Sequence, residues 1–126
     1  MKQLRQHILQ ALQQALPQET LILYENMPPR PIAEHRPYLS CQLVPEGPAS
    51  FLAQPLSLLL DIMMPRGTGT AFRDDVIAAC EAHLTYRSFG FCLFHGLAVA
   101  APDQTAHHFR QRLTLALTAF PPEVHG

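Results

Sequence analysis

The stretch from Leu56 to Leu84, LSLLLDIMMPRGTGTAFRDDVIAACEAHL, constrains the fold more than any other part of the sequence. It opens with an almost unbroken apolar run, Leu56–Met64, in which only Ser57 and Asp61 are polar. Such a run predicts a central strand that is covered on at least one face. Because proline cannot donate to a sheet ladder, we expect the strand to end at Pro65.

A turn with two glycines and an amphipathic helix follow this strand. Gly67 and Gly69 permit a sharp reversal, since glycine tolerates positive φ. The predicted helix, Thr70–Leu84, has Asp74 and Asp75 in or near its first turn, where the helix dipole favours carboxylates. Helical spacing predicts one apolar face made of Val76, Ala79, Cys80, His83 and Leu84. This unit indicates a fold class but no function.

Composition indicates one folded domain. The chain has 126 residues, 48% of them hydrophobic, which is enough for a core and argues against disorder. The formal net charge is −1, so charge gives no reason to expect sequence-specific nucleic-acid binding or an acidic membrane surface as partner.

The cysteines and the absence of long apolar segments predict a cytosolic location. The chain has 3 cysteines, each within an apolar run, which predicts buried, reduced thiols. The N-terminal sequence is too polar for a signal peptide. No apolar segment reaches the roughly 20 residues that a membrane span requires.

Periodicity places the remaining elements. Apolar residues at helical spacing predict a helix over Lys2–Leu16, which Pro17 ends. Shorter apolar runs predict further strands, with Phe51 and Leu52 as a possible start of the central strand and Pro55 as a bulge or edge position. These strands are Leu21–Tyr24, Tyr38–Val44 and Phe91–Val99, with turns predicted at Ser88–Gly90 and Pro102–Thr105.

The segment His108–Phe120 is compatible with two structures. Leu113, Leu115 and Leu117 alternate with polar or small residues, which favours a strand. Phe109, Leu113, Leu117 and Phe120 would also share one helix face. We predict a strand that pairs with Phe91–Val99 as a hairpin. The order of elements then predicts an α+β fold, with a mixed, mostly antiparallel sheet of about five strands and two helices on one face.

No motif in the sequence is typical of a catalytic or cofactor site. PRGTGT, Pro65–Thr70, lacks the lysine of a phosphate-binding loop and does not match a dinucleotide fingerprint, so we interpret it as a tight turn. The chain has 7 histidines, but residues three apart on a strand, such as Cys92 and His95, point to opposite faces and suit one metal ion poorly. We therefore expect no cofactor and no metal.

The remaining polar residues favour contacts over catalysis. Cys80 and His83 could touch on one helix, but the apolar face indicates a buried thiol. Asp61, inside an apolar strand, is interpreted as facing solvent or an arginine of another subunit. Arg30, Arg36 and Arg66 lie in stiff loops, which suits either a protein interface or a solvated loop.

Taken together, the sequence resembles the bacteriophage tail-terminator and minor tail proteins, which are often found in prophages. The resemblance rests on the opening helix followed by LILYEN, Leu21–Asn26, and on the proline-flanked strand RPYLSCQLVPEGP, Arg36–Pro48. It also rests on the strand–turn–helix unit Leu56–Leu84 and on the two closing strands. Tyr24-Glu25-Asn26, with the spacing of Pro65, Gly67 and Gly69, is the nearest feature to a fingerprint.

The resemblance implies a structural role without enzymatic activity. Such proteins form a homo-oligomeric ring, typically a hexamer, that caps the tail tube and meets the head–tail connector protein. The implied location is the bacterial cytoplasm during assembly and then the virion tail. A head-to-tail ring needs two different, complementary patches on each subunit. The candidate interface residues are Arg30, Arg36, Asp61, Arg66, Gly67 and Gly69, in or near the loops Asn26–Pro37 and Pro45–Ser50 and the turn Arg66–Thr70.

Two other readings remain open at this point. The first is another head–tail joining or neck protein, or a small bacterial adaptor of similar fold. The second, from a different class, is a small cytosolic enzyme. An enzyme would need a pocket that gathers Asp61, His83, His95 and Cys92 from distant elements.

Overall fold

The computed structural model describes residues 2–16, 22–24, 36–47, 53–67, 69–90, 92–104 and 108–120. Its elements, in chain order, are α1 (Lys2–Ala15), β1 (Ile22–Tyr24), β2 (Tyr38–Pro45), β3 (Gln54–Pro65), α3 (Ala71–His83), β4 (Ser88–Phe89), β5 (Cys92–Val99), β6 (Asp103–Gln104) and β7 (His108–Ala119).

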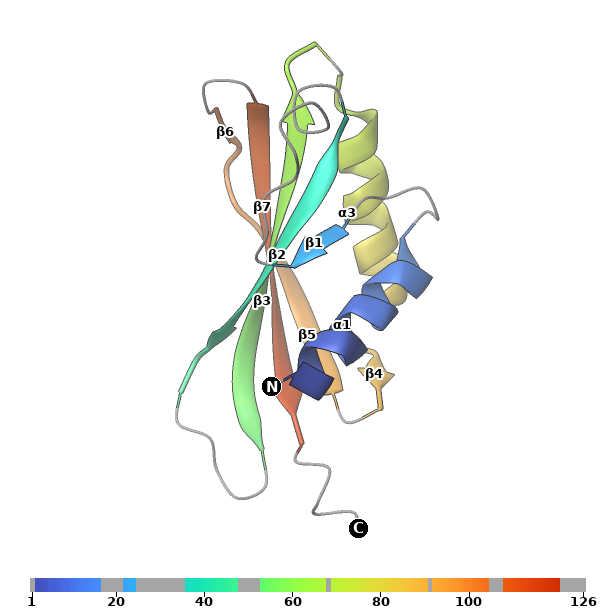
Figure 1. The fold of residues 1–126 in the computed structure, drawn as a ribbon, viewed down its shortest axis with the longest axis vertical. Helices are drawn as coiled ribbons and strands as arrows, with labels where there is room; N and C mark the ends of the chain where they lie inside the picture. Colours follow the sequence, from blue (N-terminus) through green and yellow to red (C-terminus); the bar gives the residue numbers. More distant parts are fainter. Residues whose placement is uncertain are drawn as a thin grey trace.

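The strands form one strongly twisted mixed sheet (Figure 1). The order across the sheet is β1-β2-β3-β7-β5-β4, and β6 continues beside β7 at its start. The pair β1–β2 is parallel and the other pairs are antiparallel. β3 and β7 form the centre, with an unbroken register from Gln54 opposite Ala119 to Pro65 opposite His108.

Alternation along the strands gives the sheet two different faces. Because successive side chains point to opposite sides, the even-numbered residues of β3 and the odd-numbered residues of β7 share one face. Both helices pack on this helix-covered face (Figure 1). The core between helices and sheet includes fully buried side chains from every layer: Ile8, Leu12, Leu39, Leu58, Leu60, Ile62, Leu84, Leu113 and Leu115. The opposite face carries no helix of the described residues, and we refer to it as the open face.

The predicted fold class is confirmed, as an α+β fold with two helices on one face of a mixed, mostly antiparallel sheet. The predicted helices and the longer strands are present, with boundaries that differ by one or two residues where the structure describes them. The ambiguous closing segment is a strand, and it pairs with β5 as predicted. It also pairs with β3, so β7 is a central strand that would leave both neighbours without partners if it were a helix.

Several local predictions were wrong. Ser88–Phe89 and Asp103–Gln104 were predicted as turns, but each pairs with a neighbouring strand, so the described residues form seven strands and not five. Such short strands lack a periodic pattern, and only the adjacent longer strand determines them. Of the two alternatives predicted for Pro55, the bulge is absent, because Pro55 pairs with Thr118 in regular register, whereas on the β2 side Pro55 lies at the end of the ladder. Pro55 lies one residue beyond Leu56, the last residue of β3 that pairs with β2. Its carbonyl still accepts a hydrogen bond from Glu46 N at 3.1 Å. Because the ladder with β2 has ended there, the N–H that proline lacks is not needed for strand pairing.

The apolar face of α3 is narrower than predicted. Val76, Cys80 and Leu84 are buried, as the spacing predicts, but His83 is exposed. All 3 cysteines are free and buried, which confirms the prediction of reduced thiols. The start of the central strand at Phe51 and Leu52 lies outside the described residues. Within the part of the chain that the structure describes, no helix has the length and hydrophobicity to cross a membrane.

Candidate functional site

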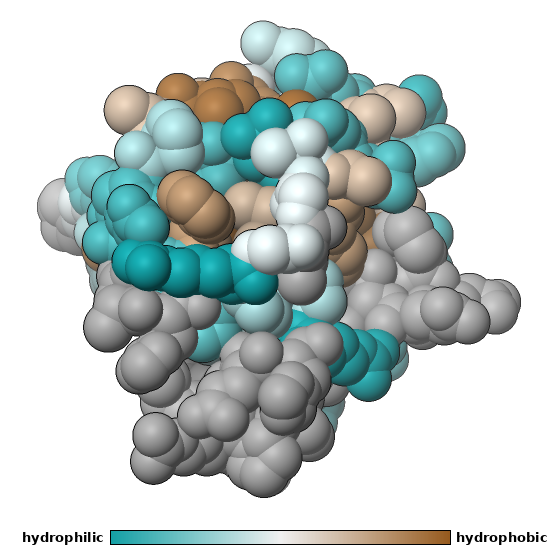
Figure 2. Space-filling model, turned by 90° about the horizontal axis from the view of Figure 1, so that it is seen from above, coloured by the Kyte–Doolittle hydropathy of each residue, from teal (hydrophilic) through white to brown (hydrophobic). Residues whose placement is uncertain are grey.

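One end of the molecule gathers most of the described candidate residues. β3 runs into its glycine turn there, and β7 and β2 begin there (Figure 1). We call this the upper end, and Figure 2 views the molecule from that side. Hydrophobic atoms form patches in this view, between hydrophilic residues that surround them (Figure 2).

The turn after β3 needs its two glycines. Gly67 has φ 88° and Gly69 has φ 78°, in the left-handed region that other residues rarely adopt. An added Cβ would meet no atom within 4 Å at either position, so backbone conformation and not space selects glycine. Both residues are exposed. The turn therefore presents its own backbone at the surface.

Two candidate arginines lie at this same end. Arg66 is an exposed residue of the turn itself. Arg36 is also exposed, two residues before Tyr38, which pairs with Met63 near the end of β3. The structure thus brings Arg36, Arg66, Gly67 and Gly69 to one end of the sheet. Arg30 and most of the loop Asn26–Pro37 lie outside the described residues, as does the second half of the loop Pro45–Ser50.

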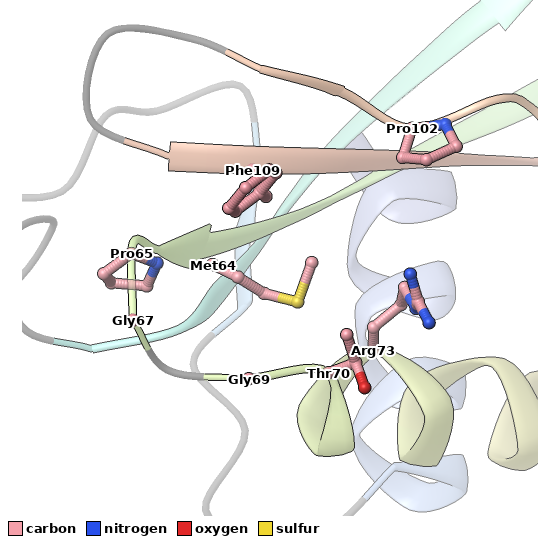
Figure 3. Close-up of a pocket in the computed structure, with 8 residues that line it drawn as sticks. All are labelled: Met64, Pro65, Gly67, Gly69, Thr70, Arg73, Pro102 and Phe109. Carbon is pink, nitrogen blue, oxygen red and sulfur yellow. The ribbon is translucent and has the colours of Figure 1, made fainter.

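An apolar cleft of about 250 Å³ opens beside the turn. It lies between the sheet and the start of α3, and Figure 3 shows Met64 and Phe109 on the sheet side, with Thr70 and Arg73 on the helix side. Pro102, which follows β5, lines the cleft as well. Phe109 is 44% exposed although it points to the helix-covered face. The cleft was not predicted from the sequence, because it combines residues 64–73 with Pro102 and Phe109, which lie about 30 residues or more further along the chain.

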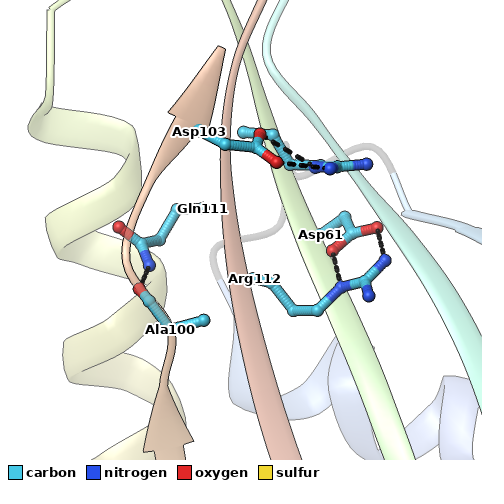
Figure 4. Close-up of polar contacts among 6 residues, drawn as sticks. Asp61, Ala100, Asp103, Gln111 and Arg112 are labelled. Atoms are coloured by element: carbon cyan, nitrogen blue, oxygen red, sulfur yellow. Dashed lines mark hydrogen bonds and ion pairs between the residues drawn. The ribbon is translucent and has the colours of Figure 1, made fainter. Parts of the chain in front are cut away.

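Asp61 lies elsewhere, on the open face of β3 and opposite Arg112 of β7. The Arg112 guanidinium donates two hydrogen bonds to the carboxylate, Nε to Oδ1 at 2.7 Å and Nη2 to Oδ2 at 2.9 Å (Figure 4). The hydrogen bond to Asp61 raises the pKa of Arg112 above its ordinary value. Asp61 was interpreted as facing solvent or an arginine of another subunit, but within this chain its carboxylate is bound by Arg112 and is 17% exposed. Sequence alone gives no signal for this pair without the β3–β7 register.

A second ion pair, between Arg110 and Asp103, lies at the upper end. Arg110 donates to both carboxylate oxygens of Asp103, and Nε reaches Oδ1 at 3.1 Å. These hydrogen bonds hold the pKa of Asp103 below its ordinary value. Nearby, the buried Gln111 amide donates to the carbonyl of Ala100 (Figure 4). Gln111 therefore holds the end of β5 against β7 where the regular pairing stops.

The groups considered for an enzymatic pocket are dispersed. Cys92 is buried in the core, and burial raises its pKa to about 11. His95 donates or accepts a hydrogen bond with Thr118 Oγ1 at 2.8 Å, on the other side of the strand. His83 is exposed at the end of α3, and Asp61 is paired with Arg112. Among the described residues, no three His, Cys, Asp or Glu side chains lie close enough to hold a metal ion.

Among the comparisons with known proteins, only the comparison of structures found a similar protein, and that similarity concerns the fold. No protein-family model matches the sequence. No curated protein is significantly similar to it. A solved structure is similar with a TM-score of 0.63 at 15% identity, and the alignment covers 94% of this chain and 97% of that one. The likeness extends over almost the full length of both chains, so the arrangement of helices and strands recurs as a unit in another protein.

Proposed function

We propose that this chain is a structural protein of a phage or prophage tail, similar to a tail terminator. Copies of it form a ring, typically a hexamer, that caps the tail tube and joins it to the head–tail connector protein. The protein acts by binding, without turnover of a substrate. It assembles in the bacterial cytoplasm and stays in the virion tail.

One observation supports this proposal most directly. Exposed arginines, an exposed glycine turn and an apolar cleft lie together at the upper end, which gives a single surface of mixed character. Apolar contacts with arginine at their border are typical of protein interfaces. The segments that form this surface include the strand–turn–helix unit on which the resemblance to tail terminators mainly rests.

The proposal also needs subunits that fit together head to tail. A closed ring requires two different patches on each copy, and the sheet offers different edges, β1 on one side and β5 with β4 on the other. The near-neutral charge of the chain allows copies to approach without strong repulsion.

The first test is the mass of the protein in solution. Light scattering over a concentration series is expected to show a shift towards a closed ring of several subunits, because assembly follows mass action. A chain that stays monomeric at every concentration, also when the tail-tube protein of the same prophage is added, would refute the proposal.

Charge reversal tests the contact surface itself. Arg36→Glu together with Arg66→Glu is expected to abolish binding to tail tubes in co-sedimentation, since both charges lie at the upper end. Arg87→Glu is the matched control, because Arg87 is equally exposed but follows the far end of α3. Equal tube binding by the double variant and the control would exclude the upper end as the tube-binding surface.

A further inference from the structure

The outer side of β5 is paired along only half of the strand. β4 covers Cys92 and Leu93. The backbone before β4 continues this cover, because Phe94 N donates to Arg87 O at 2.9 Å and Tyr86 N donates to His95 O at 3.3 Å. Beyond the irregularity between Phe94 and Leu97, no described strand lies outside β5.

The peptide groups of Leu97 and Val99 point to this outer side. Ala100 N donates to Arg112 O at 3.0 Å, so the peptide group of Ala100 faces β7. In a strand the N–H and C=O of alternate residues face opposite neighbours. Ala98 therefore faces β7, opposite Thr114, while Leu97 and Val99 present their donors and acceptors outward.

Within Leu97–Ala101 the edge carries no charge and no proline. Natural sheet edges usually carry lysine, proline, inward-pointing charges or a bulge that prevent another chain from pairing. The sequence Leu97-Ala98-Val99-Ala100-Ala101 contains none of these residues. The bulge before Leu97 and Pro102 after Ala101 limit the segment that could pair, and between them the outward peptide groups of Leu97 and Val99 have no strand partner among the described residues. Val99 is 51% exposed.

The apolar cleft opens on the same face of the sheet as the Val99 side chain, further towards the upper end. Val99 pairs with Leu113, so its side chain points to the same face as Phe109, four residues earlier on β7. Pro102 lines the cleft and lies three residues after Val99. A strand added outside Leu97–Val99 would therefore place the side chains of one of its faces beside Val99, towards the cleft.

We propose that Leu97–Val99 is a subunit interface, where the β1 edge of a second copy of this chain adds to the sheet. This inference rests on the proposed ring and identifies the contact that closes it. A second copy is the fitting occupant because the edge carries no charge that would select a charged partner, and because the chain itself is almost neutral. Within the described residues β1 pairs on one side only, with β2, so each copy offers a second and different edge. Pairing of two different edges is head to tail, as a ring requires.

The experiment combines amide hydrogen exchange with one backbone substitution. At concentrations where light scattering finds assembled protein, the amides of Leu97 and Val99 are expected to exchange far more slowly than in dilute protein. Val99→Pro removes an outward N–H that has no described partner in its own chain, and proline is tolerated at such edge positions. We expect it to weaken self-association by up to about tenfold at each contact, since one hydrogen bond is lost.

Two controls separate the backbone effect from other effects. Val99→Thr keeps the N–H and the branched shape, and it is expected to assemble like the natural chain. Val99→Lys adds a charge to the edge and is expected to block pairing, which keeps the test valid if Val99→Pro does not fold. Ala82→Lys adds the same charge on the exposed side of α3 and is expected to have no effect.

The outcomes separate this inference from the proposed function. Assembly into rings with unprotected Leu97 and Val99 amides, and normal assembly of Val99→Pro and Val99→Lys, would overturn the edge contact and leave the ring standing. Dimers with protected amides would support pairing at Leu97–Val99 and overturn the ring. Protein that remains monomeric at every concentration, also with tail tubes present, would overturn both.

Discussion

The side chains on the two faces of the sheet are held in place by different interactions. Leu58 and Leu59 are neighbours on β3, yet Leu58 is fully buried under the helices and Leu59 is partly exposed on the open face. On the helix-covered face, close packing of leucine and isoleucine removes apolar surface from water. On the open face, side chains are held by specific polar contacts, such as Asp61–Arg112 and His95–Thr118. The difference indicates that burial on the helix-covered face contributes more to stability than the polar contacts of the open face.

The largest expected effect tests this division directly. Leu58→Ala is expected to lower the free energy of unfolding by about 2–5 kcal/mol, because it leaves a cavity among fully buried side chains. Urea denaturation followed by circular dichroism measures this loss. Leu59→Ala is the matched control, and it should cost clearly less. Equal losses at the two positions would show that the open face is covered in solution.

Alkaline pH is expected to act on the helix-covered face. Burial raises the pKa of Cys41 and of Cys80 to about 12, from an ordinary value of 9.0. Above about pH 9 the unfolded thiols lose protons while the folded thiols keep them, so stability falls as pH rises towards 12. Each thiol is expected to contribute a slope of up to about 1.4 kcal/mol per pH unit.

Cys41→Ala isolates this contribution. The variant should lose stability less steeply than the natural chain between about pH 9 and 12, whatever its stability at neutral pH. Urea midpoints measured at several pH values give both slopes. Parallel curves for the two proteins would show that the Cys41 thiol ionises equally in the folded and unfolded chains.

The ion pair of the open face is expected to contribute less. The side chains of Asp61 and Arg112 are 17% and 41% exposed, so water screens their attraction in part. A double-mutant cycle with Asp61→Ala and Arg112→Ala is expected to give a coupling energy of about 1 kcal/mol, at the upper end for exposed pairs because the contact is bidentate. The coupling should decrease in high salt. A coupling of several kcal/mol that salt does not change would place the pair in a buried environment.

The smallest effect is expected at the His95–Thr118 contact. Thr118→Val keeps the shape of the side chain and removes the hydroxyl that meets His95 Nε2 at 2.8 Å. The expected loss is about 0.5 kcal/mol, at the low end for one hydrogen bond because the contact is partly open to water. Thr114→Val is the control on the same face and strand, and it should change stability by less. Equal effects would mean that the hydrogen bond contributes nothing measurable.

Much of the fold follows from local pattern in the sequence. The run Leu56–Met64, the glycines at positions 67 and 69 and the helical spacing after them were sufficient to predict β3, its turn and α3. These predictions succeed because the relevant physics acts over a few residues, through alternation, positive φ and the helical period. Short strands such as β4 and β6 escaped prediction because pairing with a longer neighbour alone makes them strands.

The candidate site depended far more on tertiary structure. The sequence identified Arg36, Arg66, Gly67 and Gly69 as surface residues for contacts, but it gave no sign of Phe109, Arg73 and Pro102 beside them. It identified Asp61 as unusual and missed Arg112, 51 residues away. Residue type and local spacing determine which side chains can form a strand, a turn or a charged contact. The register and the order of the strands decide which of these side chains come into contact. Both depend on pairing between segments that are distant in the sequence, which no local pattern encodes.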